Sequence, residues 1–267
     1  MPTVSVVIPT FNAAEFISET IDSVLTQSYS DLELIVVDDC STDNTANIVR
    51  EISRKDHRLS IVELDTNYGG PAGPRNIGVA RATGKWICFL DADDLWHPSK
   101  VSIQLAGLQE FGCVFSCTNI TTFNEMAQFN SYASPDNSLS YRRYTFRQQC
   151  SKNRICNSSV MVASELAKSN PFNELPTYHA VEDMQCWLQI LESIDECLVI
   201  DEKLVGYRIN PNQISRNKFK MAKKFFMVIS NYKLQSGGGF GWRKYWFFTQ
   251  YCFYSLKTVW ERHVSKT

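Results

Sequence analysis

Short apolar runs alternate with helical patterns through the first 110 residues of the chain. Four of these runs are short enough to be buried strands: Val4 to Ile8, Leu32 to Val37, Leu59 to Leu64 and Trp86 to Leu90. The segments between them carry apolar residues three or four positions apart, and a further helix is expected from Pro98 to about Phe111. This alternation predicts an α/β layer with a mostly parallel sheet flanked by helices.

Polar residues follow three of the predicted strands at the point where each one ends. The three clusters are residues 9–12, "PTFN", with Pro9, Thr10 and Phe11, after the first strand, Asp38 and Asp39 after the second, and residues 91–94, "DADD", after the fourth. Ligands of open α/β sheets bind beyond the carboxyl ends of the strands. We therefore expect the three clusters to meet on one rim of the sheet.

The acids of "DADD" raise the question of which positive charge compensates them. In extended backbone, residues i and i+2 project on the same side, so Asp91 and Asp93 are expected to point together. Two carboxylates are suitable ligands for Mg²⁺ or Mn²⁺, which complete their coordination with water and substrate phosphates. The alternative is that these acids are solvated loop residues.

The pair Asp38 and Asp39 also has two interpretations. Together with Ser41 and Thr42, which precede a predicted helix, these residues could simply cap a helix N-terminus. At a ligand-facing strand end, a carboxylate can instead accept hydrogen bonds from a nucleobase or a ribose. We assign that second role to Asp39.

Four segments in order resemble the blocks of family 2 inverting glycosyltransferases. They are "VSVVIPTFN", "ELIVVDDCSTDNT", "NYGGPAGPRNIGVARATGKWICFLDADDLWHPSK" and "VEDMQCWLQI". The resemblance is dense over residues 4–110 and thinner over 178–215. It implies a GT-A fold over residues 1–215, with a nucleotide-binding half at 1–110 and an acceptor half at 111–215, and a nucleotide-sugar donor.

The same resemblance implies roles for residues of the donor site. Thr10 and Asp39 would contact the nucleobase, with Pro9 and Asp38 beside them, and Arg75 would line the donor pocket. Asp91 would face the ribose and the metal, and Asp93 would ligate the metal. A divalent ion across two phosphates stabilises the charge that develops on a nucleoside diphosphate leaving group.

An inverting transfer also needs a base that stands apart from the metal. Glu182 and Asp183 lie at a predicted helix start, where acids commonly offset the helix dipole. The resemblance implies instead that Asp183 is the catalytic base and that Glu182 and Trp187 bind the acceptor. His179 is expected to be a bystander, and the departure of residues 207–215 from the family pattern leaves the roles of Arg208 and Ser215 open.

The net charge of −1 conceals two opposite parts of the chain. Residues 1–201 contain 14 basic and 26 acidic residues, whereas residues 202–267 contain 13 basic and 2 acidic ones. In segment 216–267 the cations are interleaved with aromatic residues, as in helices that lie on an anionic membrane. Alternatives are nucleic-acid binding, which we do not expect, and packing of the aromatic residues onto the catalytic domain.

The remaining features favour a cytoplasmic enzyme at the inner face of the plasma membrane. The 9 cysteines have no zinc-type spacing, the N-terminus resembles a strand rather than a signal peptide, and no apolar run is long enough to span a bilayer. We expect single-hexose transfer from a UDP-sugar to an undecaprenyl diphosphate-linked or polysaccharide acceptor in O-antigen or capsule assembly. The alternative is a non-catalytic nucleotide- or glycan-binding module.

Overall fold

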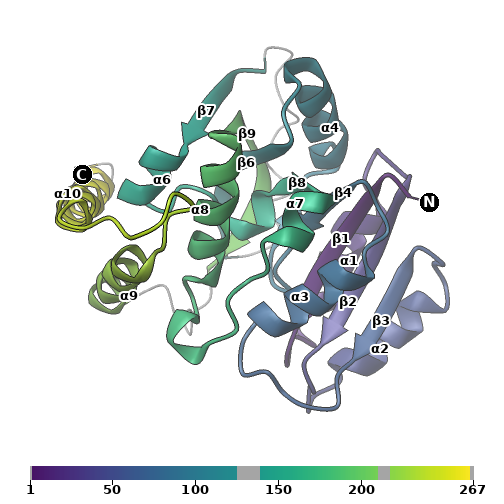
Figure 1. The fold of residues 1–267 in the computed structure, drawn as a ribbon. Helices are drawn as coiled ribbons and strands as arrows, with labels where there is room; N and C mark the ends of the chain where they lie inside the picture. Colours follow the sequence, from purple (N-terminus) through teal and green to yellow (C-terminus); the bar gives the residue numbers. More distant parts are fainter. Residues whose placement is uncertain (1, 125–138, 210–216, 265–267) are drawn as a thin grey trace.

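A single mixed sheet forms the centre of the computed structural model, which describes residues 2–124, 139–209 and 217–264 (Figure 1). The strand order is β3-β2-β1-β4-β8-β6-β9-β5, and β7 pairs with β9 outside this path. The strands are β1 (Val4–Thr10), β2 (Leu32–Asp38), β3 (Leu59–Glu63), β4 (Trp86–Phe89), β5 (Leu95–Trp96), β6 (Phe115–Phe123), β7 (Tyr141–Thr145), β8 (Met161–Ala163) and β9 (Glu196–Arg208).

Helices cover both faces of this sheet (Figure 1). The α-helices are α1 (Ile17–Leu25), α2 (Thr45–Ser53), α3 (Ala72–Arg81), α4 (Lys100–Phe111), α6 (Phe146–Ser151), α7 (Ser164–Ser169), α8 (Glu182–Ile194), α9 (Lys218–Asn231) and α10 (Arg243–Val264). Two short 3₁₀ turns are η1 (Asn157–Ser159) and η2 (Pro176–Tyr178). The predicted α/β class is therefore confirmed.

The parallel part of the sheet is its N-terminal half. β1 pairs in parallel with both β2 and β4, and β2 pairs in parallel with β3. β8 then pairs antiparallel with both β4 and β6, so the second half of the sheet is mixed. Parallel pairing in this half was predicted from the regular alternation of strands and helices, which is lost after Cys113.

Apolar side chains of the helices pack against the two faces of the sheet. α3, α7 and α8 contribute to the core on one face, and α1, α2 and α4 contribute to the core on the other. On the first face α3 lies very close to β1, since a Cβ atom on Gly78 would come within 2.3 Å of Val7 Cγ1. Burial of this apolar surface is the main stabilisation of the fold.

The segment after β9 packs onto the body of the protein through some of its aromatic residues. Phe225 on α9 is buried in a cluster with Val181 and Met184, which flank the start of α8. The connection between α9 and α10 is anchored as well, because Phe240 is buried and stacks on Tyr232 with ring centroids 5.5 Å apart. Packing onto the body, left open by the sequence, is thus confirmed for these residues.

Other aromatic residues of the same segment are exposed. They are Phe219, Trp242, Tyr245, Trp246 and Phe253, each with more than half of its surface accessible. Within the described residues, no helix is both long and apolar enough to cross a membrane. The predicted boundary between residues 215 and 216 lies outside the described residues.

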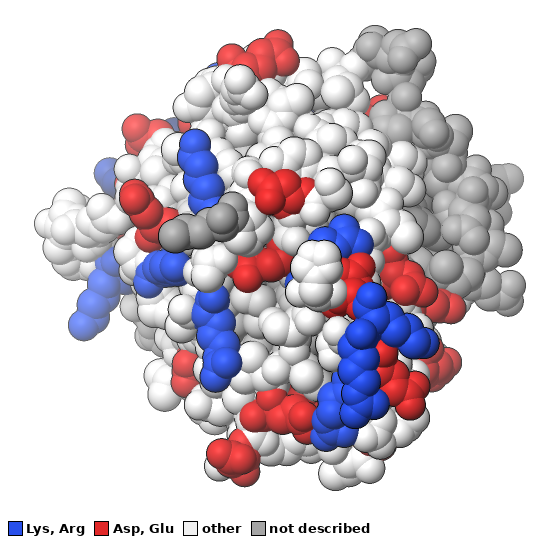
Figure 2. Space-filling model, turned by 90° about the vertical axis from the view of Figure 1, so that its right-hand side faces the viewer, with Lys and Arg blue, Asp and Glu red and all other residues white. Residues whose placement is uncertain are grey.

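Charges are mixed on the face that contains the N-terminal half of the sheet. Figure 2 shows acidic and basic side chains side by side there, rather than gathered by sign. The imbalance between the two parts of the sequence therefore does not produce a field of one sign on this face.

The prediction that Trp187 binds the acceptor is corrected by its position. Its side chain has no exposed surface and packs against Phe89, Phe115 and Phe172, with ring centroids 5.5 to 5.8 Å apart. The inward face of α8 carries this side chain into the core. Trp187 therefore supports the sheet and does not reach a ligand.

We expect Trp187→Ala to lower the free energy of unfolding by about 3–5 kcal/mol, because it removes a large buried side chain and leaves a cavity. Chemical denaturation measures this loss. Trp187→Phe should lower the free energy of unfolding by less, because it leaves a smaller cavity, and it should leave the KM for the acceptor unchanged. A selective rise of that KM would show that Trp187 contacts the acceptor.

Candidate functional site

The three strand-end clusters meet on one rim, as the sequence predicts. Thr10 at the end of β1 lies opposite Asp38 at the end of β2, and the Asp39 N–H donates to the Thr10 carbonyl over 2.8 Å. Because β4 pairs with β1 in parallel, residues 91–94 emerge at the same edge.

A cavity of about 370 Å³ opens at this rim. Its lining is formed by Pro9, Thr10, Phe11, Asp39, Asn67, Gly69, Gly70, Pro71, Pro74 and His179. Of these residues, Pro9, Thr10, Phe11 and Asp39 were expected at the strand ends, Asn67 was given no role, and His179 was expected to be a bystander. The "NYGG" stretch was the available signal, since Gly69 has a φ of +71° and turns the chain along the cavity wall.

Asp38 and Asp39 have different roles, which corrects the prediction for Asp38. Both carboxylate oxygens of buried Asp38 accept hydrogen bonds from Ser41, one from its N–H over 3.0 Å and one from its hydroxyl over 2.5 Å. Asp39 instead lines the cavity and accepts the Tyr68 N–H over 2.8 Å. Cys40, with a φ of +62°, makes the turn that follows them.

Two polar groups of the cavity are poised for a ligand. Burial raises the pKa of the Asp39 carboxyl, and the charge of Asp38 adds to this effect. Thr10 Oγ1 is buried and forms no hydrogen bond with any described residue. Because buried polar atoms are nearly always paired, such an atom indicates a place for a hydrogen-bonding ligand.

The acids after β4 form a turn and not an extended strand. The Asp94 N–H donates to the Asp91 carbonyl over 3.1 Å, so the extended geometry predicted for Asp91 and Asp93 is wrong. The two carboxylates nevertheless interact. Burial, together with the negative charge of Asp91, raises the pKa of Asp93 to about 6.

Buried contacts hold this turn in place. The carboxylate of Asp94, 1% exposed, accepts the Ser158 hydroxyl over 2.6 Å and the Arg208 N–H over 3.1 Å. Arg208 also donates from Nε to the Asp93 carbonyl over 2.8 Å. Asp94 and Arg208, whose roles the sequence left open, therefore anchor the turn.

The residues of the turn fit a divalent cation that shares its shell with a substrate. Two neighbouring carboxylates whose repulsion raises a pKa would be relieved by a cation. No group of three or more metal-ligating side chains occurs in the described parts of the chain. Mg²⁺ and Mn²⁺ commonly take only one or two carboxylates and fill the remaining positions with phosphate oxygens and water.

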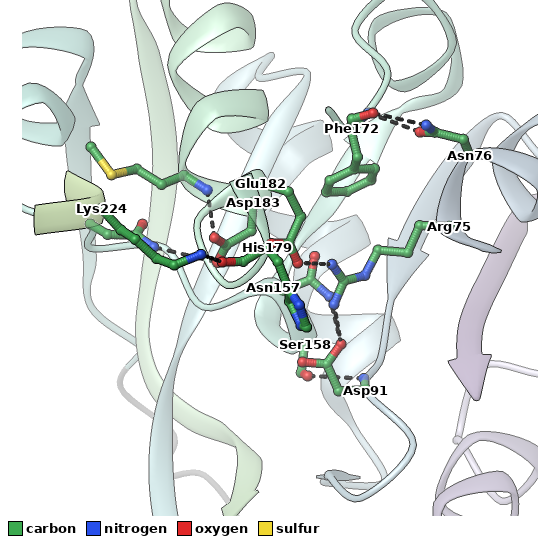
Figure 3. Close-up of polar contacts among 12 residues, drawn as sticks. Arg75, Asn76, Asp91, Asn157, Ser158, Phe172, His179, Glu182, Asp183 and Lys224 are labelled. Atoms are coloured by element: carbon green, nitrogen blue, oxygen red, sulfur yellow. Dashed lines mark hydrogen bonds and ion pairs between the residues drawn. The ribbon is translucent and has the colours of Figure 1, made fainter. Parts of the chain in front are cut away.

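Arg75 connects the turn to the start of α8 (Figure 3). Its guanidinium is buried and lies 2.7 Å from Asp91 Oδ1 and 2.8 Å from Glu182 Oε1. It does not line the cavity with Asp39 but bridges Asp91 and Glu182, and its predicted role in the donor pocket stays a prediction. Glu182, predicted to bind the acceptor, is likewise buried as the partner of Arg75.

Asp183 lies beside this ion-pair chain with a partly exposed side chain (Figure 3). Burial and the charge of Glu182 raise its pKa to about 7, although Arg75 and the Met184 N–H favour the charged form. Asn153 Nδ2 is 3.4 Å from the second carboxylate oxygen. A carboxylate with a pKa near neutrality can accept a proton at physiological pH.

The segment that carries His179 is held by α9. Lys224 donates from Nζ to the backbone carbonyl of His179 and, over 3.3 Å, to that of Thr177 (Figure 3). His179 lines the cavity, so a helix of the C-terminal segment helps to position the cavity wall. No pattern in the amino-acid sequence indicates this contact.

Comparison with known proteins identifies the family. The family model described as "Glycosyl transferase family 2" matches residues 5–165, which include the whole strand-end rim. The chain belongs to this glycosyltransferase family. The resemblance noted in the sequence is thereby confirmed.

Relatives and solved structures agree with this assignment. The glycosyltransferase is 35% identical to the putative teichuronic acid biosynthesis glycosyltransferase TuaG of Bacillus subtilis, over 85% of this chain and 87% of that protein. It is 33% identical to the Escherichia coli glucosyltransferase WfgD, over 86% of each. Its fold matches S. aureus TarS 1–349 in complex with UDP-GlcNAc, with a TM-score of 0.68 at 21% identity, over 94% of this chain and 71% of that one.

The raised pKa of Asp183 predicts an effect on stability. A folded-state pKa above the unfolded value means that the carboxylate destabilises the glycosyltransferase increasingly as the pH rises towards and through about 7. Asp183→Asn removes this cost. We expect its Tm to exceed that of the wild type by roughly 2–6 °C at pH 8, with the difference shrinking towards pH 5.

A suitable control is Asp195→Asn, at the other end of α8, where the φ of +66° is one that asparagine tolerates. Scanning calorimetry at several pH values measures both variants. An increase that does not depend on pH would contradict a raised pKa of Asp183 in the folded state.

Proposed function

We propose that the protein is a metal-dependent, inverting hexosyltransferase. It moves one hexose from a UDP-sugar to a lipid-linked or polysaccharide acceptor in the assembly of bacterial surface polysaccharide. The observation that carries this proposal is the separation of two carboxylate sites, the turn after β4 and the start of α8, with Arg75 paired to one acid of each.

In this proposal the cavity at the rim holds the nucleoside. Asp39 accepts hydrogen bonds from the base, Thr10 Oγ1 offers the free hydroxyl group, and Pro9 and Phe11 provide apolar contact. Asp91 and Asp93 would hold Mn²⁺ or Mg²⁺, which would stabilise the negative charge of the leaving diphosphate. Arg75 keeps the Asp91 carboxylate oriented towards that position.

Asp183 acts as the base. Its raised pKa lets it take the proton of the acceptor hydroxyl as that oxygen attacks the anomeric carbon from the face opposite the nucleotide. Glu182 does not compete for this role, because its carboxylate is buried against Arg75.

The biological setting is inferred from the relatives. TuaG is named for teichuronic acid biosynthesis, and WfgD is named as transferring glucose from UDP-Glc to GlcNAc-diphosphoundecaprenol. An acceptor carried on a lipid remains in the bilayer, so its enzyme must work at a membrane surface. The exposed aromatic residues and excess cations after residue 201 suit peripheral binding to the anionic inner face of the plasma membrane.

Asp93→Asn tests the donor site. The substitution removes one of the two proposed metal ligands, so the Mn²⁺-dependent part of UDP affinity should fall by about tenfold or more. Isothermal titration calorimetry of UDP with and without Mn²⁺ measures this. The matched control is Asp65→Asn, which removes an exposed carboxylate after β3; unchanged metal dependence in Asp93→Asn would remove Asp93 from the site.

Asp183→Asn tests the base. We expect UDP-sugar binding to persist while transfer to the acceptor falls by about 10²–10⁴-fold, because the attacking hydroxyl loses its proton acceptor. In the wild type, kcat/KM for the acceptor should rise with pH through about 7, since only the deprotonated carboxylate works. Asp195→Asn should transfer normally.

The same measurements decide between an enzyme and a non-catalytic binding module. A module would bind UDP-sugar with Mn²⁺ and transfer nothing, whatever the acceptor. Retention of transfer in Asp183→Asn would leave an enzyme that uses a different base.

A further inference from the structure

A second hollow lies away from the rim, where the connection between α9 and α10 packs against α6. It has a volume of about 730 Å³, within the range of small-molecule sites. Phe240 and Phe247 are nearly buried at its base, and Trp242 and Trp246 stand exposed beside them. We call this hollow the tail groove.

The polar part of the tail groove is cationic. Arg147 on α6 and Arg243 on α10 line it, and neither guanidinium forms an ion pair or a hydrogen bond with another described residue. Arg243 is also the first residue of a 22-residue helix with no acid in its first turn. Cations are unfavourable at this end of a helix dipole, so a bound anion would offset a cost that the fold carries.

The tail groove is linked to the segment of the proposed base by shared packing. Phe240 and Phe247 belong to the apolar cluster that contains Val181 and Met184, on either side of Glu182 and Asp183. From Arg147, α6 leads to buried Gln149, which donates to Asn153 Oδ1 over 2.7 Å, and Asn153 contacts Asp183. A ligand in the groove is thus connected to Asp183 through a short segment of chain.

These observations together point to one chemical class. The ligand must have an anionic group for two arginines and an apolar body for a groove of aromatic side chains. We propose that the tail groove binds the polyprenyl diphosphate part of a lipid-carried acceptor, with the phosphates on Arg147 and Arg243 and the first isoprene units on the aromatic side chains. This inference rests on the proposed function and adds the site that would hold the carrier.

Binding to a bilayer by diffuse charge is the competing explanation. The segment after residue 201 carries 13 basic and 2 acidic residues, so any anionic surface attracts it. Diffuse attraction depends on the number of cations and not on which of them is removed. A built site depends on Arg147 and Arg243 in particular.

The test is the affinity of the full chain for farnesyl diphosphate, measured by calorimetry in mild detergent without divalent cations. Omitting the metal suppresses binding of the diphosphate at the rim. Inorganic diphosphate, farnesol and phosphatidylglycerol vesicles serve as comparison probes. The test variant is Arg147→Gln with Arg243→Gln, and the control is Lys233→Gln with Lys244→Gln, which removes the same charge from residues that do not line the groove.

We expect the wild type to bind farnesyl diphosphate more tightly than inorganic diphosphate or farnesol. The arginine variant should lose about tenfold or more of this affinity, because two charge-assisted contacts are removed, and the lysine control should change less than about twofold. Vesicle binding should fall equally in both variants. Thermal unfolding checks that both are folded.

The proposal is overturned if the wild type does not bind farnesyl diphosphate or if both variants lose affinity equally. It is also overturned if inorganic diphosphate binds as tightly as farnesyl diphosphate does. It is also overturned if phosphatidylglycerol vesicles abolish the binding of farnesyl diphosphate at a comparable concentration. That result would indicate a surface that binds any anionic lipid. Binding that depends on the two arginines, in a protein that transfers no sugar, would contradict the proposed function but support the carrier site in the tail groove. Sugar transfer together with binding that does not depend on the arginines would contradict the carrier site alone.

Discussion

The buried guanidinium of Arg75 is the contact on which the site depends. A cation removed from water needs anionic partners, and Arg75 has one on each side, Asp91 in the turn after β4 and Glu182 at the start of α8. The loss of Arg75 would leave the buried Glu182 carboxylate, and that of Asp91, without this cation. The two halves of the site, distant in sequence, are thereby held at a fixed separation.

The same contact distributes work between two adjacent acids. Glu182 forms a buried ion pair with Arg75. Burial, together with the negative charge of Glu182, raises the pKa of Asp183 to about 7. One acid is structural and the other is left basic. An ordinary helix-dipole role would not distinguish the two, because it would favour the charged form of both.

The sequence predicted those features that depend on local pattern. Strand ends follow from apolar runs, and parallel pairing brings Thr10, Asp39 and Asp91 to one edge. The predictions from sequence were wrong where the direction of a side chain determines its role, because Asp38 turns towards Ser41 and Trp187 faces the core. Contacts between distant segments, such as that of Lys224 with His179, leave no periodicity to detect.

If both diphosphate sites are as proposed, they explain the uneven distribution of charge along the chain. The donor diphosphate would meet carboxylates and bind only with a metal between, whereas the carrier diphosphate would meet arginines and need none. Carboxylates repel a diphosphate that lacks its metal, and arginines repel the metal. Each site therefore discriminates against the other's ligand by charge, so a chain of near-zero net charge can hold two similar groups without exchanging them.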